Sequence, residues 1–153
     1  MSIPSIVYKA HATGNDFVVY LDAEGTYEPT ADEVRFLCDR HFGIGGDGLI
    51  RLTHPQAVSD LNDKQIAVCA ADNADWFMDY RNADGSLAEM CGNGTRATAQ
   101  FLVQQGMLEL EEGDAFKLGT RAGVKRITRM PDNPELGRQL WRVDMGSWSM
   151  GAE

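Results

Sequence analysis

Short apolar segments separated by polar, glycine-containing stretches run along the chain, and most of them predict β-strands. Runs of β-branched and aromatic residues bounded by turn residues are typical of strands. Such runs occupy residues 3–7, 17–21, 49–52, 66–70, 76–81, 116–118, 124–130 and 140–143. The sequence Asn-Ala-Asp-Gly at residues 82–85 is a strong turn signal, which predicts that residues 87–90 run back alongside the preceding strand.

Two other segments have the residue spacing of helices. Thr30 and Glu33 form a capping box, because a hydroxyl and a carboxylate at this spacing each reach a free backbone N–H group. The helix that they open is expected to continue to about Arg40. A second helix is predicted over residues 95–105, ended by Gly106. Small or apolar residues occupy nearly every side of this helix, and a helix of that kind is usually buried.

The order of these elements predicts an α+β fold. It lacks the regular strand–helix alternation of a parallel sheet, so we expect mixed or antiparallel strands wrapped around a buried central helix. The length of 153 residues suits one domain. We place this domain at residues 1–146 and expect residues 147–153 to be a tail or a linker to a second domain.

Composition and charge disfavour several classes of function. The formal net charge is −9, whereas binding to nucleic acid requires clustered Lys and Arg. No apolar run approaches the roughly 18 residues of a membrane-spanning helix. The first residues also lack the features of a signal peptide, so we expect a cytoplasmic protein. Cys38, Cys69 and Cys91 are odd in number and lack CxxC spacing, which favours neither disulfides nor a zinc site.

The segment around Cys91 carries the clearest signs of chemistry. Cys91 lies just before the predicted buried helix, whose first backbone amides lack internal partners and carry partial positive charge. Both effects favour the thiolate over the thiol. Gly92 and Gly94 leave room for a ligand, and the same amides suit a carboxylate. An activated sulfur beside an anion site is what proton transfer at an amino-acid α-carbon needs. The alternative is a buried, inert thiol.

Three motifs carry a resemblance to a known family. Residues 82–96 read NADGSLAEMCGNGTR, residues 11–17 read HATGNDF and residues 37–48 read LCDRHFGIGGDG. In this order they resemble the motifs of diaminopimelate epimerases, and the resemblance covers most of residues 6–146. It implies the fold of that family and interconversion of LL- and meso-diaminopimelate, in lysine and peptidoglycan biosynthesis, without pyridoxal phosphate or a metal.

The resemblance also implies roles for individual residues. The family uses two cysteines on opposite faces of the α-carbon, and Cys91 matches the one that returns the proton in the LL-to-meso direction. Gly92 and Asn93 match positions that contact substrate, and Asn15 and Asn82 match asparagines that hold its polar ends. An amide suits that role because it donates to a carboxylate and accepts from an ammonium. The alternative for both asparagines is the capping of turns.

The second cysteine of such a pair has no counterpart in this sequence. Cys38 lies on the apolar face of a helix, and Cys69 has no glycine pair after it. We therefore expect that the chain alone does not epimerise, and that a carboxy-terminal domain carrying the second cysteine is its missing partner. The oligomeric state is open, with a homodimer as one option. Gly48 stands where some family members have glutamine.

Other functions compete with this interpretation. Proline or hydroxyproline racemases use paired cysteines on the same architecture, a non-catalytic amino-acid-binding module would keep only the fold, and a redox sensor would use Cys91 alone. Residues 43–48 match the pattern GxGxxG, but a dinucleotide fingerprint follows a strand and opens a helix. This segment is predicted to follow a helix and precede a strand, which disfavours nucleotide binding.

Overall fold

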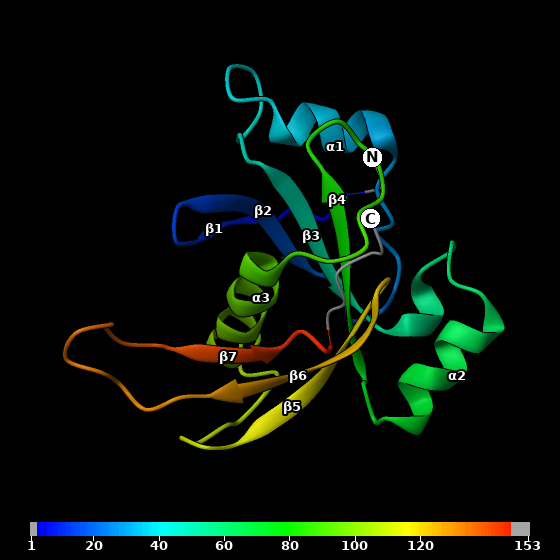
Figure 1. Cartoon of the computed structure of the whole chain (residues 1–153). Helices are drawn as coiled ribbons and strands as arrows, with labels where there is room; N and C mark the ends of the chain where they lie inside the picture. Colours follow the sequence, from blue (N-terminus) through cyan, green and yellow to red (C-terminus); the bar gives the residue numbers. More distant parts are fainter. Residues whose placement is uncertain (1–2, 148–153) are drawn as a thin grey trace, which may run out of the picture.

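The strands form one mixed sheet in the computed structural model, which describes residues 3–147 (Figure 1). Within these residues the sheet has seven strands in chain order. They are β1 (Tyr8–Ala12), β2 (Asn15–Leu21), β3 (Gly48–Thr53), β4 (Trp76–Asn82), β5 (Ala115–Thr120), β6 (Gly123–Arg129) and β7 (Trp141–Asp144). The pairs β2–β3 and β4–β5 are parallel and the others antiparallel. All of the predicted tail except Ser147 lies outside the described residues.

Three α-helices and one 3₁₀ helix complete the described part of the chain. They are α1 (Ala31–Cys38), η1 (Pro55–Ala57), α2 (Asp63–Ala71) and α3 (Gly92–Gln104). The predicted capping box of α1 is confirmed, since the Glu33 N–H donates to Thr30 Oγ1 at 3.2 Å and the Thr30 N–H donates to Glu33 Oε2 at 2.9 Å. Over residues 3–147, no helix combines the length and apolarity that crossing a membrane requires.

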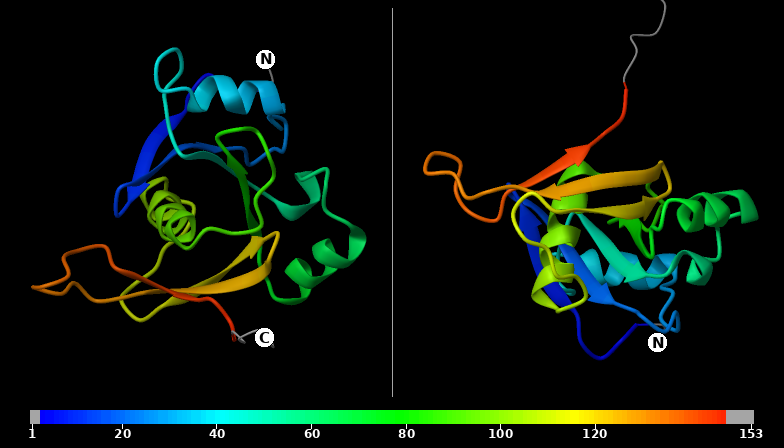
Figure 2. Two further views of the ribbon diagram at one scale, coloured as in Figure 1. Left: turned by 45° about the horizontal axis from the view of Figure 1, so that its top comes forward. Right: turned by 90° about the horizontal axis from the view of Figure 1, so that it is seen from below.

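The sheet curls, so that β1–β4 and β5–β7 lie on different sides of α3 (Figure 2). Within residues 3–147, the strand pairing between the two groups is limited to Trp76 and Phe77 of β4 with Leu118 and Gly119 of β5. Helix α3 contacts β1, β2, β3, β4, β6 and β7. Its buried residues are Gly94, Thr95, Ala97, Thr98, Ala99, Phe101 and Leu102. The predicted α+β class is confirmed, with a curled, mixed sheet.

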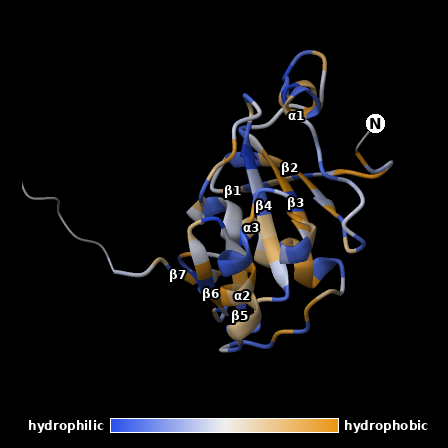
Figure 3. Ribbon diagram, turned by 90° about the vertical axis from the view of Figure 1, so that its right-hand side faces the viewer, coloured by the Kyte–Doolittle hydropathy of each residue, from blue (hydrophilic) through white to orange (hydrophobic). Residues whose placement is uncertain are grey.

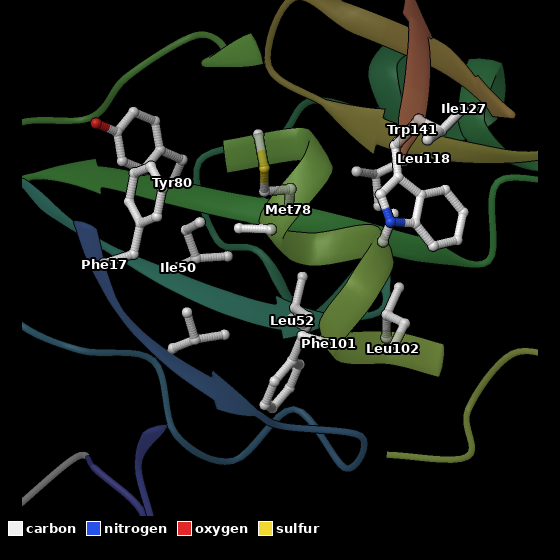
Figure 4. Close-up of a cluster of buried hydrophobic side chains, with 13 residues drawn as sticks. Phe17, Ile50, Leu52, Met78, Tyr80, Phe101, Leu102, Leu118, Ile127 and Trp141 are labelled. Carbon is white, nitrogen blue, oxygen red and sulfur yellow. The ribbon is translucent and has the colours of Figure 1, made fainter. Parts of the chain in front are cut away.

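Side chains of β2 and β3 alternate between two hydrophobic clusters on the two faces of the sheet, and Figure 3 shows hydrophobic residues along both strands. Phe17 and Val19 of β2 belong to the cluster that includes α3, whereas Val18 and Tyr20 pack with α1. This period of two follows from the pleat of a strand. The face toward α3 holds the larger cluster, whose main side chains are drawn in Figure 4.

Charged side chains are also buried in this sheet. Arg51 of β3 is fully buried and donates to Asp22 at 2.8 Å and to Asp79 at 3.3 Å. Arg81 and Arg121 also bond to Asp79. Removing one partner of such a network typically costs about 3–5 kcal/mol, because the other charge stays buried. No local pattern in the sequence predicts this network.

Two predicted strands are in the wrong place. The prediction of a strand at residues 66–70 is wrong, because these residues lie in α2. Asn62 and Gln65 form a capping box at its start, with the Gln65 N–H donating to Asn62 Oδ1 at 2.9 Å. The first strand is β1 rather than residues 3–7, since the tight turn at Thr13 and Gly14 pairs Tyr8 with Val19.

The predicted return at residues 87–90 is present only at its start. Leu87 forms an isolated antiparallel bridge with Arg81, and the Ala88 N–H donates to the Tyr80 carbonyl at 3.2 Å, but no strand forms. The Asn82 N–H donates to the Ser86 carbonyl at 2.9 Å, so the turn itself is present. Beyond it the chain leaves the sheet and runs directly to Cys91 at the start of α3.

Candidate active site

Four segments of the chain meet at one end of the sheet. In the strand register Phe17 of β2 lies beside Gly48 of β3, and Gly48 lies beside Asn82 of β4. The loop before β3 joins β2 here, because the Asp47 N–H donates to the Asp16 carbonyl at 2.8 Å. Helix α3 begins at the same end. The topology thus gathers three of the motifs found in the sequence.

Cys91 is the N-cap residue of α3, one position before the helix begins at Gly92. The Gly94 N–H donates to its Sγ at 3.4 Å. The N–H groups of Gly92 and Asn93 find no acceptor within residues 3–147, as expected for the first turn of a helix. The sulfur therefore lies at the positive end of the helix dipole. Cys91 is half-buried, which argues against the alternative of a fully buried, inert thiol.

Asn15 brings the start of β2 against Cys91. Its Oδ1 lies 3.5 Å from Cys91 Sγ and accepts from Asn93 Nδ2 at 3.2 Å. Its Nδ2 donates to Asp47 Oδ2 at 2.7 Å. Because a carboxylate can only accept, Asp47 fixes the orientation of the Asn15 amide and turns its carbonyl oxygen toward the sulfur.

Asn93 is held by a second group of polar side chains. Its Oδ1 accepts from Arg96, one helical turn further on, and from Thr13 Oγ1 at 3.3 Å. Asn15 and Asn93 thus lie together beside Cys91. Thr13, Asp47 and Arg96 were not foreseen as members of the site. All three residues lie in or beside the motifs found in the sequence. Their closeness in space, however, depends on the curled sheet.

A cluster of charged side chains lies next to Asn15 and Asp47. Arg40 donates two hydrogen bonds to Asp16, at 2.8 and 2.9 Å, and a third to Asp47 at 3.0 Å. Lys9 Nζ lies 2.7 Å from Asp16. Hydrogen bonds from Arg40 and Lys9 hold the pKa of Asp16 well below its usual range. The cluster therefore fixes the loop before β3 against β2.

The other two predicted substrate-binding residues, Asn82 and Gly92, are in different surroundings from Asn15 and Asn93. Asn82 lies at the same end of the sheet, but its Nδ2 donates to Ser86 Oγ at 3.0 Å, which is the turn-capping alternative. At Gly92 an added methyl group would meet Met145 at 3.9 Å, an ordinary van der Waals distance. Gly94 has a packing role instead, because an added methyl group would lie 3.4 Å from Ile50.

The remaining cysteines lie in hydrophobic clusters. Cys38 packs with Val18 and Val34 on the face of the sheet that carries α1, and Cys69 packs with Phe77. Burial raises the pKa of the Cys38 thiol to about 11 and also raises the pKa of Cys69. Neither sulfur has the surroundings of Cys91.

Solved structures with the same fold include isomerases. A hydroxyproline epimerase from Agrobacterium vitis matches with a TM-score of 0.51 and 18% identity, over 83% of this chain and 37% of that chain. A phenazine biosynthesis protein of the PhzF family from Bacillus anthracis matches with a TM-score of 0.54 and 24% identity, over 84% of this chain and 36% of that one. The fold is therefore the one shared by PhzF-type and racemase-type proteins.

The sequence narrows this class to one family, the diaminopimelate epimerases, to which the chain belongs. A sequence profile of diaminopimelate epimerase matches residues 7–151. The diaminopimelate epimerase of Thermobifida fusca is 44% identical over 124 residues, which are 81% of this chain and 43% of the relative. That of Corynebacterium glutamicum is 41% identical over 138 residues, 90% of this chain and 45% of the relative. The chain thus spans less than half the length of these relatives.

Proposed function

We propose that this chain supplies one face of a cofactor-independent, two-cysteine diaminopimelate epimerase, with Cys91 as its proton-transferring group. One observation carries the proposal. The Cys91 sulfur lies between a hydrogen-bond acceptor, Asn15 Oδ1 at 3.5 Å, and a donor, the Gly94 N–H at 3.4 Å.

Both protonation states of Cys91 have a partner in this arrangement. The thiol donates to the Asn15 carbonyl, which Asp47 keeps turned toward it. After the proton has left, the thiolate accepts from Gly94 and is stabilised by the helix dipole. A group that gives a proton in one direction and takes it in the other needs both partners. In the LL-to-meso direction, Cys91 acts as the acid.

The polar groups around the sulfur suit an amino acid. The free N–H groups of Gly92 and Asn93 are donors for a carboxylate, as at other helix N-termini. Asn15 and Asn93 offer amide groups beside the sulfur. Asn82 joins them by releasing its bond to Ser86 when substrate is bound. The proposed substrate is diaminopimelate.

The complete reaction needs a second sulfur. A thiolate on one face removes the α-proton as the C–H bond breaks, and the Cys91 thiol delivers a proton to the opposite face of the resulting carbanion. Cys38 and Cys69 are buried away from Cys91, so the second group comes from a further domain. In this proposal residues 1–146 form one domain with α3 as its buried central helix, and the chain alone does not epimerise.

A chimera tests the proposal. Residues 1–147 of this chain replace the matching half of the Thermobifida fusca relative, and conversion of LL- into meso-diaminopimelate is followed by chiral chromatography. A general acid typically contributes a factor of about 10²–10⁴ to the rate. Cys91→Ala in the chimera is therefore expected to lower the rate by at least about 10²-fold.

Cys38→Ala is the matched control, because it removes a sulfur at the end of α1 that packs in the other hydrophobic cluster, and it is expected to leave the rate within about twofold. Unchanged activity of the Cys91→Ala chimera would contradict the assignment. Binding of diaminopimelate without any turnover by the unmodified chimera would instead favour a non-catalytic binding module.

A further inference from the structure

The segment that leads to Cys91 is held by the turn between β5 and β6. This segment, between β4 and α3, forms neither a strand nor a helix. The Glu89 carbonyl, two residues before Cys91, accepts from the Ala122 N–H of the turn at 3.2 Å. The Ala88 N–H donates to the Tyr80 carbonyl of β4, also at 3.2 Å. The path of the chain to the N-cap of α3 thus depends on a contact with the second group of strands (Figure 2).

The turn between β5 and β6 is tight and closed by its own hydrogen bonds. Thr120 and Gly123 are paired in the strand register and enclose Arg121 and Ala122. Thr120 Oγ1 donates to the Gly123 carbonyl at 2.7 Å and accepts from the Ala122 N–H at 3.2 Å. Gly123 has a φ of 98°, in the left-handed region that favours glycine. The place of the Ala122 N–H is therefore set by whatever holds this turn against β4.

The side chain of Arg121 joins the turn to β4 beyond the point where the strands separate. The pairing of β4 with β5 ends at Phe77 and Gly119, so Asp79 and Tyr80 of β4 lie outside it. The Arg121 guanidinium donates to the Asp79 carboxylate at 2.7 Å and to the Tyr80 carbonyl at 3.1 Å. These bonds connect the turn to β4 where the ladder no longer does.

We propose that Arg121 is a positioning residue for the sulfur of Cys91. The Tyr80 carbonyl accepts from Arg121 and from the Ala88 N–H, so one atom anchors both the turn and the segment before α3. With both anchored, the Cys91 sulfur stays at the Gly94 N–H, the donor to its thiolate. The inference rests on the proposed function and adds to it a residue that acts through the backbone, two contacts away from the sulfur.

A purely structural role in the buried charge network makes a different prediction. The Arg121 side chain is 7% exposed and also bonds to Asp60, at 2.7 and 2.8 Å. Asp79 has Arg51 and Arg81 as further partners, so it keeps cations beside it when Arg121 is replaced. Asp60→Asn removes an ion pair of Arg121 and leaves its bonds to β4. A network role predicts similar effects of Asp60→Asn and Arg121→Gln, whereas a positioning role predicts that only Arg121→Gln affects the sulfur.

Alkylation of the 153-residue chain by iodoacetamide, with peptide mapping of all three cysteines, tests the inference. In Arg121→Gln, modification of Cys91 at pH 7 is expected to be about two- to tenfold slower, the effect of losing one hydrogen bond to the thiolate. At pH 10, above the usual thiol pKa of about 8.5, the variant and the unmodified chain are expected to agree within about twofold. The matched control Asp60→Asn is expected to react like the unmodified chain at both pH values.

Cys38 and Cys69 report on folding in the same experiment, because both are buried. If they react in Arg121→Gln, Arg121→Lys takes its place and is expected to slow Cys91 in the same way, since lysine keeps the charge but lacks the planar fork of donors. An unchanged Cys91 rate in a folded Arg121 variant, or an equal slowing in Asp60→Asn, overturns the role of Arg121. Either result leaves the proposed function standing, because alkylation requires neither substrate nor turnover. Failure of diaminopimelate to protect Cys91 overturns the proposed function instead.

Discussion

The sulfur of Cys91 lies 3.5 Å from Oδ1 of Asn15, a residue 76 positions earlier in the chain. The contact joins the N-terminus of α3 to the first residue of β2. Asp47 orients the Asn15 amide through a bond of 2.7 Å, so the oxygen rather than the nitrogen faces the sulfur. The loop before β3 thereby shapes the surroundings of the Cys91 sulfur.

Replacing Asn15 tests this relationship. Asn15→Leu removes the acceptor for the thiol and leaves the Gly94 N–H, the donor to the thiolate, in place. Alkylation of Cys91 by iodoacetamide at pH 7 is expected to become about two- to tenfold faster, the effect of losing one neutral hydrogen bond. Asn82→Leu is the control, because the Asn82 amide bonds to Ser86 instead. A slower reaction in Asn15→Leu would mean that Asn15 stabilises the thiolate.

The three cysteines are expected to react in a fixed order. At pH 7.5 iodoacetamide modifies Cys91 and spares Cys38 and Cys69 in the folded chain, because both are buried and burial raises the pKa of each. In urea all three react at similar rates. Peptide mapping by mass spectrometry distinguishes the sites. Early modification of Cys38 in the folded chain would contradict the burial described for it.

The Asp16 cluster predicts how stability depends on pH. The folded-state pKa of Asp16 is depressed, chiefly by Arg40 and then by Lys9. In the unfolded chain, Asp16 titrates near the ordinary value of about 3.9. Between the two values the unfolded state binds more protons, so the stabilisation is present above about pH 4 and is lost as the pH falls further.

Urea unfolding of the parent chain and Asp16→Asn at pH 6 and pH 3 measures this effect. The variant is expected to be less stable than the parent at pH 6, and the difference is expected to shrink at pH 3. Other carboxylates, such as Asp60 beside Arg121, titrate in both proteins and cancel in the comparison. A difference that stays constant between the two pH values would contradict the depressed pKa of Asp16.

Two glycines of the site are expected to respond differently to alanine. Gly48→Ala places a methyl group 2.5 Å from the Tyr80 ring and 2.7 Å from the Arg81 carbonyl oxygen. Overpacking of this kind typically costs about 1–3 kcal/mol in the free energy of unfolding. Gly92→Ala meets nothing closer than 3.9 Å and is expected to change stability by less than about 0.5 kcal/mol. Urea unfolding decides, and equal losses would contradict the packing described at Gly48.

Local sequence signals predicted much of the fold. Capping residues and β-branched runs correctly indicated α1, β2, β3, β4 and the three later strands. The prediction at residues 66–70 is wrong because the apolar residues Ile66 and Val68 resemble a strand, whereas the capping box of Asn62 and Gln65 begins a helix there. This box has the same geometry as the box of α1. The error at residues 3–7 arose because a hairpin register depends on the turn at Thr13 and Gly14.

The site was predictable only in part, because its members come from distant segments. The motif around Cys91 pointed to the helix N-terminus, and Asn15 and Asn93 do lie beside the sulfur. The orienting role of Asp47 depends on the parallel pairing of β2 and β3, which no local pattern encodes.

Protection of Cys91 by substrate tests the central claim most directly. The chain is treated with iodoacetamide at increasing concentrations of diaminopimelate, and modification of Cys91 is followed by peptide mapping. The account predicts that diaminopimelate slows this reaction to saturation, whereas L-proline has no effect. Modification of Cys91 at an undiminished rate under saturating diaminopimelate would contradict a substrate site at this sulfur, and would leave a thiol redox sensor as the better interpretation.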